Sequence, residues 1–61
     1  MLTEEVSYLF LNEGEYYYIY GIGIGIATEI DGIMEVRYSY GTIYDVSEYQ
    51  FFTVPTLDQL L

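Results

Sequence analysis

The side chains best suited to chemistry in this sequence are carboxylates, because the chain holds no His, Cys or Lys. Two carboxylates at a suitable separation perform acid and base chemistry in glycosidases. The candidates here are Glu29, Asp31, Glu35, Asp45 and Glu48. They fall at turns and polar positions, where a solvated surface places acids, and a small domain has little room for a ligand cleft of about 300 to 1,000 Å³. Cation binding by clustered acids is an alternative, but the spacing of a calcium loop is missing. We therefore predict that the chain is not an enzyme and has no catalytic residue, cofactor or metal site.

The glycine run Gly21-Ile22-Gly23-Ile24-Gly25 invites comparison with a phosphate-binding loop. That loop needs a strand before it, a helix after it and a third glycine at another spacing. Here the alternation continues as a strand toward Asp31-Gly32. Glycines on one side of a strand let it coil strongly or let another backbone approach. The run therefore indicates either curvature within the domain or a flat contact site for another chain.

The tyrosines are the residues best suited to binding. Alternation along a strand sends Tyr17 to the opposite face from Tyr16 and Tyr18, so this cluster cannot all enter one small core. Tyrosine is enriched at protein interfaces because it buries a large amphipathic surface, and acids around it form a polar rim. We predict a protein-binding surface, with core packing as the alternative for the set. Its predicted residues are Tyr16, Tyr17, Tyr18, Tyr20, Tyr40, Tyr44, Leu57 and Leu60.

Charge restricts the partners. Ten acids stand against a single Arg37, giving a formal net charge of −9. Such a chain repels phosphate, so we predict neither nucleic acid nor a membrane as partner. The charge either keeps a tyrosine-rich surface soluble or attracts a basic surface. No apolar run reaches the roughly 20 residues of a membrane span, and the first residues lack the positive flank of a signal peptide, which predicts a cytoplasmic protein.

A chain of 61 residues allows one domain, spanning residues 1–61. At this size only about 60% of the unfolded surface is buried on folding. Cysteine is absent, so no disulfide supports the fold. The remaining supports are a good core, self-association or docking on a partner.

Turn residues divide the chain into about five short strands. Residues 15–30 are too many for one straight strand, so we expect a loop or sharp bend near residues 16–20. A break at Ser47-Glu48 indicates a bulge or short turn. The predicted strands are residues 6–11, 20–30, 33–40, 43–46 and 49–54.

Asp31-Gly32 between two alternating runs predicts a tight hairpin, because a type I′ turn needs positive φ at both central residues. In the strand that follows, we expect Val36 and Tyr38 to be buried, and Glu35 and Arg37 to be exposed.

The tail changes character after Pro55. Thr56 with Gln59 fits a capping box, which predicts a short C-terminal helical turn that presents Leu57, Leu60 and Leu61 together. These leucines either close an open end of the sheet or insert into a groove on another subunit or partner.

Two runs and two further segments carry a resemblance to a known family: Gly25-Ile26-Ala27-Thr28-Glu29-Ile30, Met34-Glu35-Val36-Arg37-Tyr38, Gly41 and residues 49–54. Over about residues 21–54 the chain resembles the small SH3-like proteins that are common in tailed-phage genomes. Such proteins often carry Trp where this chain has Tyr38, and nucleic-acid-binding relatives carry Lys and Arg where it has acids. The resemblance implies an all-β, SH3-like barrel of antiparallel strands. An aromatic groove for Pro-rich peptides, as in SH3 domains, is one alternative that it brings.

Together these features predict a non-enzymatic acidic interaction module, of the kind found among phage structural or accessory proteins. Its partner is another protein or a second copy of the chain, in the host cytoplasm or the virion. The alternative from another class is an acidic inhibitor that imitates the charge of DNA and occupies the nucleic-acid site of a host enzyme.

Overall fold

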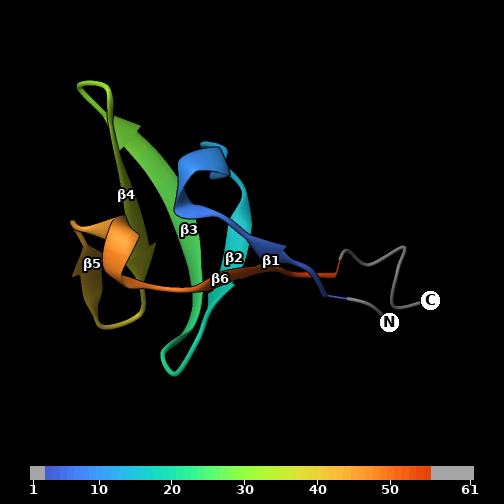
Figure 1. The fold of residues 1–61 in the computed structure, drawn as a ribbon. Coiled ribbons are helices and arrows are strands. Elements are labelled where there is room, and N and C mark those ends of the chain that lie inside the picture. Colours follow the sequence, from blue (N-terminus) through green and yellow to red (C-terminus); the bar gives the residue numbers. More distant parts are fainter. Residues whose placement is uncertain (1–2, 56–61) are drawn as a thin grey trace.

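The computed structural model describes residues 3–55 and has an all-β fold (Figure 1). Six strands form one antiparallel sheet in the order β1-β6-β2-β3-β4-β5. A 3-10 helix follows each edge strand, η1 (Tyr8–Phe10) after β1 and η2 (Val46–Glu48) after β5. The strands are β1 (Glu5–Val6), β2 (Tyr16–Ile19), β3 (Gly23–Ile30), β4 (Ile33–Tyr38), β5 (Gly41–Ile43) and β6 (Phe51–Thr53).

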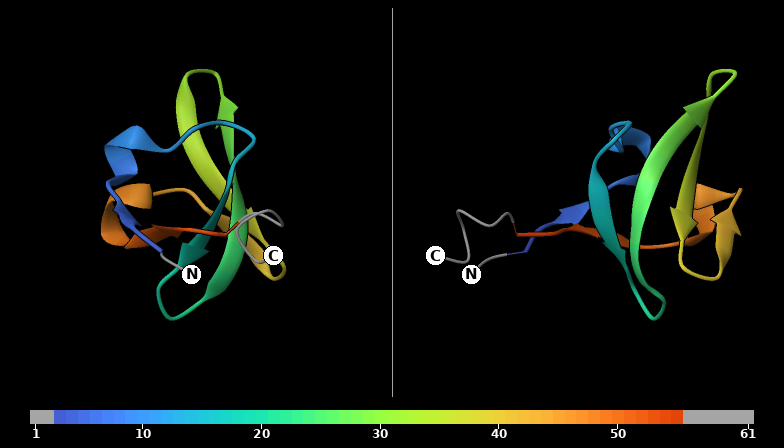
Figure 2. Two further views of the ribbon diagram at one scale, coloured as in Figure 1. Left: turned by 90° about the vertical axis from the view of Figure 1, so that its right-hand side faces the viewer. Right: turned by 180° about the vertical axis from the view of Figure 1, so that it is seen from behind.

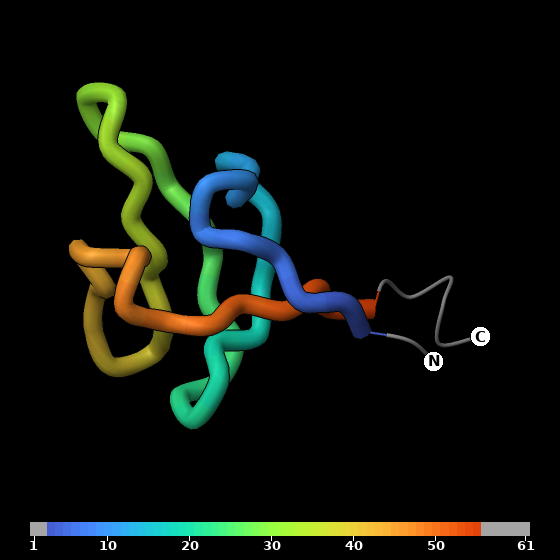
Figure 3. The backbone as a smooth tube through the Cα atoms, viewed as in Figure 1, coloured from blue at the N-terminus to red at the C-terminus, as the bar shows by residue number. Residues whose placement is uncertain are grey.

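The sheet is strongly coiled. Figure 2 shows β3 bowing along its length, and η1 contacts η2, so the segments that follow the two edge strands meet. Near the ends of the described chain, β1 lies beside β6, as the tube in Figure 3 shows, with Val6 opposite Phe51. The curl encloses one side of the sheet and leaves the other side as an outer face.

The core lies on the enclosed side. Its members occupy alternate positions of the strands, together with one residue of the loop after η1. Phe51, Ile19 and Val36 are completely buried, and each contributes about 1.5 to 3 kcal/mol by leaving water. The buried core residues are Leu11, Tyr17, Ile19, Ala27, Val36, Ile43 and Phe51.

The Asp31-Gly32 hairpin is confirmed. Ile30 pairs with Ile33, and the two turn residues have φ of 52° and 80°, as a type I′ turn requires. In β4, Val36 is buried and Arg37 is exposed, as predicted. Tyr38 packs against the core but is half-buried rather than buried.

Glu35 differs from the prediction, because it is half-buried rather than exposed. It stands directly opposite Thr28 on β3. Side chains at such cross-strand positions touch, so the neighbour covers part of the glutamate stem.

The bend in the long alternating segment lies later than predicted. Residues 16–19 form β2, and the chain reverses at residues 20–22, where Ile22 N donates to Ile19 O at 2.9 Å. Gly21 and Gly23 have φ of 79° and 134°, angles that glycine adopts without strain. Two of the three glycines in the run therefore make the turn.

The third glycine of the run, Gly25, packs against neighbouring strands. A Cβ there would lie 2.8 Å from Arg37 O, 2.8 Å from Val36 Cγ1 and 3.0 Å from Ile19 Cδ1. Such contacts are too close for a side chain. Glycine at position 25 therefore allows the neighbouring strands to pack closely inside the domain.

The ends of the sheet correct two other expectations. Residues 6–11 do not form one strand, because Ser7 Oγ accepts from Leu9 N at 3.2 Å and begins η1. The predicted strand 43–46 is also wrong, because β5 spans Gly41–Ile43 and shares only Ile43 with it. Asp45 Oδ1 accepts from Ser47 N at 3.2 Å and begins η2. The predicted break at residues 47–48 is thus a 3-10 turn, and the sheet has six strands rather than five. The predicted C-terminal helical turn lies outside the described residues.

Candidate protein-binding surface

Strand β2 divides the tyrosine cluster between the two sides of the sheet. Tyr17 points inward and is 4% exposed, whereas Tyr16 and Tyr18 are 59% and 38% exposed. The Tyr17 hydroxyl accepts a hydrogen bond from Asn12 N at 2.9 Å, which satisfies its polar atom. The assignment of Tyr17 to the binding surface is therefore corrected: this side chain belongs to the core.

On the outer face, Tyr16 and Tyr18 join apolar side chains from the neighbouring strands. The register places Tyr18 between Phe52 of β6 and Ile24 of β3, and Tyr16 opposite Ile26. Paired residues of a sheet point to the same side, so these side chains form one surface. The rings of Tyr18 and Phe52 pack with centroids 6.2 Å apart at 45°. We call Tyr16, Tyr18, Ile24, Ile26 and Phe52 the outer strip.

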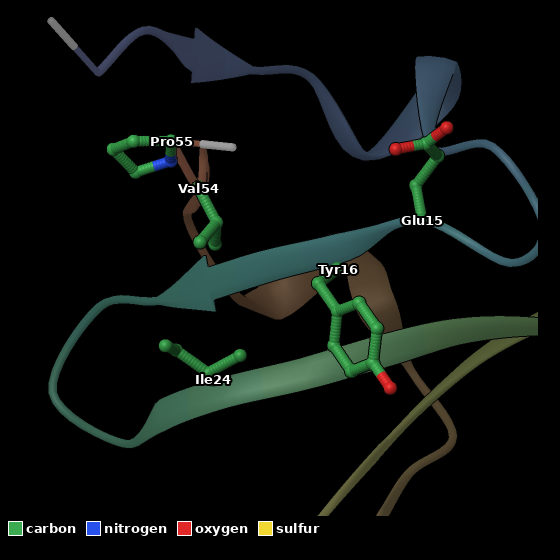
Figure 4. Close-up of a pocket in the computed structure, with 5 residues that line it drawn as sticks. All are labelled: Glu15, Tyr16, Ile24, Val54 and Pro55. Atoms are coloured by element: carbon green, nitrogen blue, oxygen red, sulfur yellow. The ribbon is translucent and has the colours of Figure 1, made fainter. Parts of the chain in front are cut away.

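A shallow groove of about 230 Å³ runs along one end of the outer strip (Figure 4). Tyr16 and Ile24 line it together with the residue before β2 and the two residues that follow β6. The volume is below the roughly 300 to 1,000 Å³ of small-molecule sites, so the groove suits one side chain of a partner better than a cofactor. Its lining residues are Glu15, Tyr16, Ile24, Val54 and Pro55.

The other predicted tyrosines are exposed but lie outside the outer strip. Tyr20 begins the turn after β2, and Tyr40, 94% exposed, sits in the turn between β4 and β5. Figure 1 shows both turns at the same end of the sheet. Tyr44 follows β5 and is also exposed. Leu57 and Leu60 lie outside the described residues.

Sequence reasoning missed several exposed apolar side chains. Leu9 and Phe10 of η1 are exposed because the 3-10 turn directs them away from the core that a strand would have reached. Ser7 was the available signal, since serine is a favoured N-cap residue. Ile24, now part of the outer strip, was visible in the alternation, but alternation alone does not say which side is covered.

Two exposed acids border the outer strip and its groove. Of the acids in residues 3–55, all but the half-buried Glu35 are exposed. Glu5 stands opposite Phe52 on β1, at one end of a row of the outer strip, and Glu15 lines the groove. Within the described part of the chain, no group of three or more acids is placed to hold a metal ion. In the same residues, no helix is long and apolar enough to cross a membrane.

Comparison of the chain with protein-family models, with curated proteins and with solved structures finds no match in any of the three. The function proposed for this surface therefore rests on its own residues.

Proposed function

We propose that this chain is a non-enzymatic interaction module that docks on another protein, or on a second copy of itself, through its exposed tyrosines. The outer strip carries the proposal. Its side chains from three adjacent strands form one aromatic and aliphatic surface, of which Tyr16, Tyr18 and Ile24 are exposed. Soluble monomers rarely leave contiguous apolar surface uncovered unless it serves binding. Tyr20, Tyr40 and Tyr44 extend the tyrosine-rich surface beyond the strip.

We propose further that the coiled sheet is a small SH3-like barrel of the tailed-phage type. The contact between η1 and η2 supports this fold, because it brings together the segments that follow the two edge strands. The resemblance over about residues 21–54 supports a structural or accessory role in the virion or the host cytoplasm.

The second candidate function is imitation of DNA, and the net charge of −9 favours it. A mimic presents its acids where DNA presents phosphates. On the outer face, by contrast, the middle strands present the apolar outer strip, with Glu5 at the end of one row. The docking module therefore accounts better for the surface as a whole.

The salt dependence of partner affinity distinguishes the two candidate functions. The tagged chain is used to capture its partner from its native cell, and the affinity of the purified pair is measured from about 50 to about 500 mM salt. Docking mainly by apolar burial predicts a far weaker salt dependence than imitation of phosphate, because burial is not screened and only the charges at the margin are. A fall by several orders of magnitude, as for contacts to phosphate, contradicts docking and supports the mimic.

A further inference from the structure

We infer that the outer strip binds a positively charged segment of a different protein, whose apolar side chains cover Tyr18, Ile24 and Phe52 and whose Lys or Arg side chains face Glu5 and Glu15. The inference rests on the proposed docking function. It adds the location of the site and the chemistry of the partner.

The apolar part of the site is a continuous row across three strands. Phe52, Tyr18 and Ile24 are direct cross-strand neighbours, so they meet without a gap in register. Their neighbour Tyr16 borders the groove of about 230 Å³. A partner segment that covers the row thus has a place for one long side chain beside it.

The groove suits a long basic side chain. Its Tyr16, Ile24 and Val54 walls are apolar, and Glu15 completes the lining, with its carboxylate directed away from Tyr16 and Ile24 in Figure 4. Lys and Arg bury their aliphatic stems on apolar surface and keep the charged end at the polar edge. The Tyr16 ring adds a favourable face for the cation.

Charge at the margins points to the same partner. Glu5 ends the row on the β1 side, and Glu15 borders the groove. The chain's single basic side chain, Arg37, lies opposite Ile26 on β4, at the margin of the outer strip away from Glu5. A segment rich in Lys or Arg is therefore complementary to the margin nearest Phe52 and Tyr16, and complementary charge speeds association and excludes wrong partners.

The same charges argue against a second copy as the occupant. Each copy carries a net charge of −9, and two outer strips that cover each other would bring Glu5 and Glu15 of both copies into one interface. Like charges placed together at an interface are costly. A basic segment of a different protein meets neither problem.

The probe is a library of random peptides of about 12 residues, selected for binding to the purified chain. We expect the selected peptides to carry net positive charge and to combine Lys or Arg with apolar residues. Titration of the isotope-labelled chain with one such peptide should then shift the backbone amide resonances of β2, β6 and the first half of β3 more than those elsewhere.

A matched pair of tyrosines locates the site. Tyr18 and Tyr8 have nearly equal exposure, 38% and 39%, but Tyr8 belongs to η1, outside the outer strip. Tyr18→Ser should weaken peptide binding by about tenfold or more, and Tyr8→Ser by less than about twofold. Circular dichroism checks that both variants remain folded. Glu5→Gln with Glu15→Gln should slow association and reduce the preference for basic peptides.

Four outcomes overturn the inference. If the selected peptides are acidic or uncharged, the partner chemistry is wrong, and if the shifts centre on Tyr40 and Tyr44, the location is wrong; in both cases the proposed docking function stands. If the free chain dimerises through the outer strip, a second copy is the occupant. If the chain is monomeric and no peptide is selected, the inference and the proposed function both fail.

Discussion

The inner and outer sides of β2 and β6 place similar residues in opposite environments. Tyr17 and Tyr18 are neighbours in the chain, yet one is enclosed and hydrogen-bonded to Asn12 N, and the other lies in the outer strip. Phe51 and Phe52 repeat the contrast on β6. The type of a residue therefore does not tell whether it contributes to stability or to binding. Its position does, because successive residues of a strand point to opposite sides of the sheet. Substitutions on the inner side should cost stability, and those on the outer side should cost binding.

The largest effect is expected at Phe51. Phe51→Ala should lower the free energy of unfolding by about 3 to 5 kcal/mol, because the side chain is completely buried and its loss leaves a cavity. Its neighbour Phe52 is the control, and Phe52→Ala should cost clearly less because that ring is partly exposed. Urea denaturation followed by circular dichroism measures both. Equal losses would show that the assignment of inner and outer sides is wrong.

Gly25→Ala should be the next most destabilising change, by about 1 to 3 kcal/mol, because a methyl group there meets backbone and core atoms. Gly41 provides the control, since a Cβ at that position finds only Tyr38 atoms at 3.8 Å and 3.9 Å. Gly41→Ala should leave stability unchanged or raise it by a few tenths to about 1 kcal/mol. Thermal unfolding of the two variants distinguishes a packing role for Gly25 from a general effect of glycine replacement. A Gly25→Ala chain as stable as the parent would refute that role.

Removal of single hydroxyls should have a smaller effect. Tyr17→Phe should cost about 1 kcal/mol, because the partly buried hydrogen bond from Asn12 N loses its acceptor. Tyr18→Phe removes only a 3.4 Å contact with Gly21 N at the surface, so it should cost at most a few tenths of a kcal/mol. Chemical denaturation of the two variants in parallel provides the comparison, and a larger loss for Tyr18→Phe would contradict it.

The double variant Tyr16→Ser with Tyr18→Ser should cost far less stability than Phe51→Ala. Exposed positions outside special features usually change stability by no more than about 0.5 kcal/mol each. Urea denaturation of the double variant tests this, and a loss comparable with that of Phe51→Ala would mean that the outer strip belongs to the core rather than to a binding surface.

Much of the fold was predictable because local signals determine it. The hairpin at Asp31-Gly32 follows from turn chemistry, and the burial of Val36 and exposure of Arg37 follow from alternation. The turn after β2 was misplaced because the alternating pattern continues through it. Only the positive φ angles of Gly21 and Gly23 reveal the reversal.

The side of β2 that faces the core was not predictable from hydrophobicity. One parity holds bulky residues such as Tyr18 and Ile24, and the other holds Tyr17 and Ile19 with the small Gly25 and Ala27. The lighter set lies inside, because the enclosed side of a small coiled sheet has little volume and Gly25 lies against Val36. That choice depends on tertiary packing, and it decides that the bulky set forms the outer strip.

We propose that the chain binds its partner through the outer strip rather than through its overall charge. This is tested by measuring the affinity of the captured partner for two variants. One is Tyr16→Ser with Tyr18→Ser, and the other is Glu29→Gln with Asp31→Asn and Glu48→Gln, which neutralises three exposed acids outside the strip. We predict that the first variant loses about tenfold or more in affinity and that the second changes by less than about threefold. A tolerated serine pair together with loss of binding in the neutralised variant would contradict docking and establish imitation of DNA in its place.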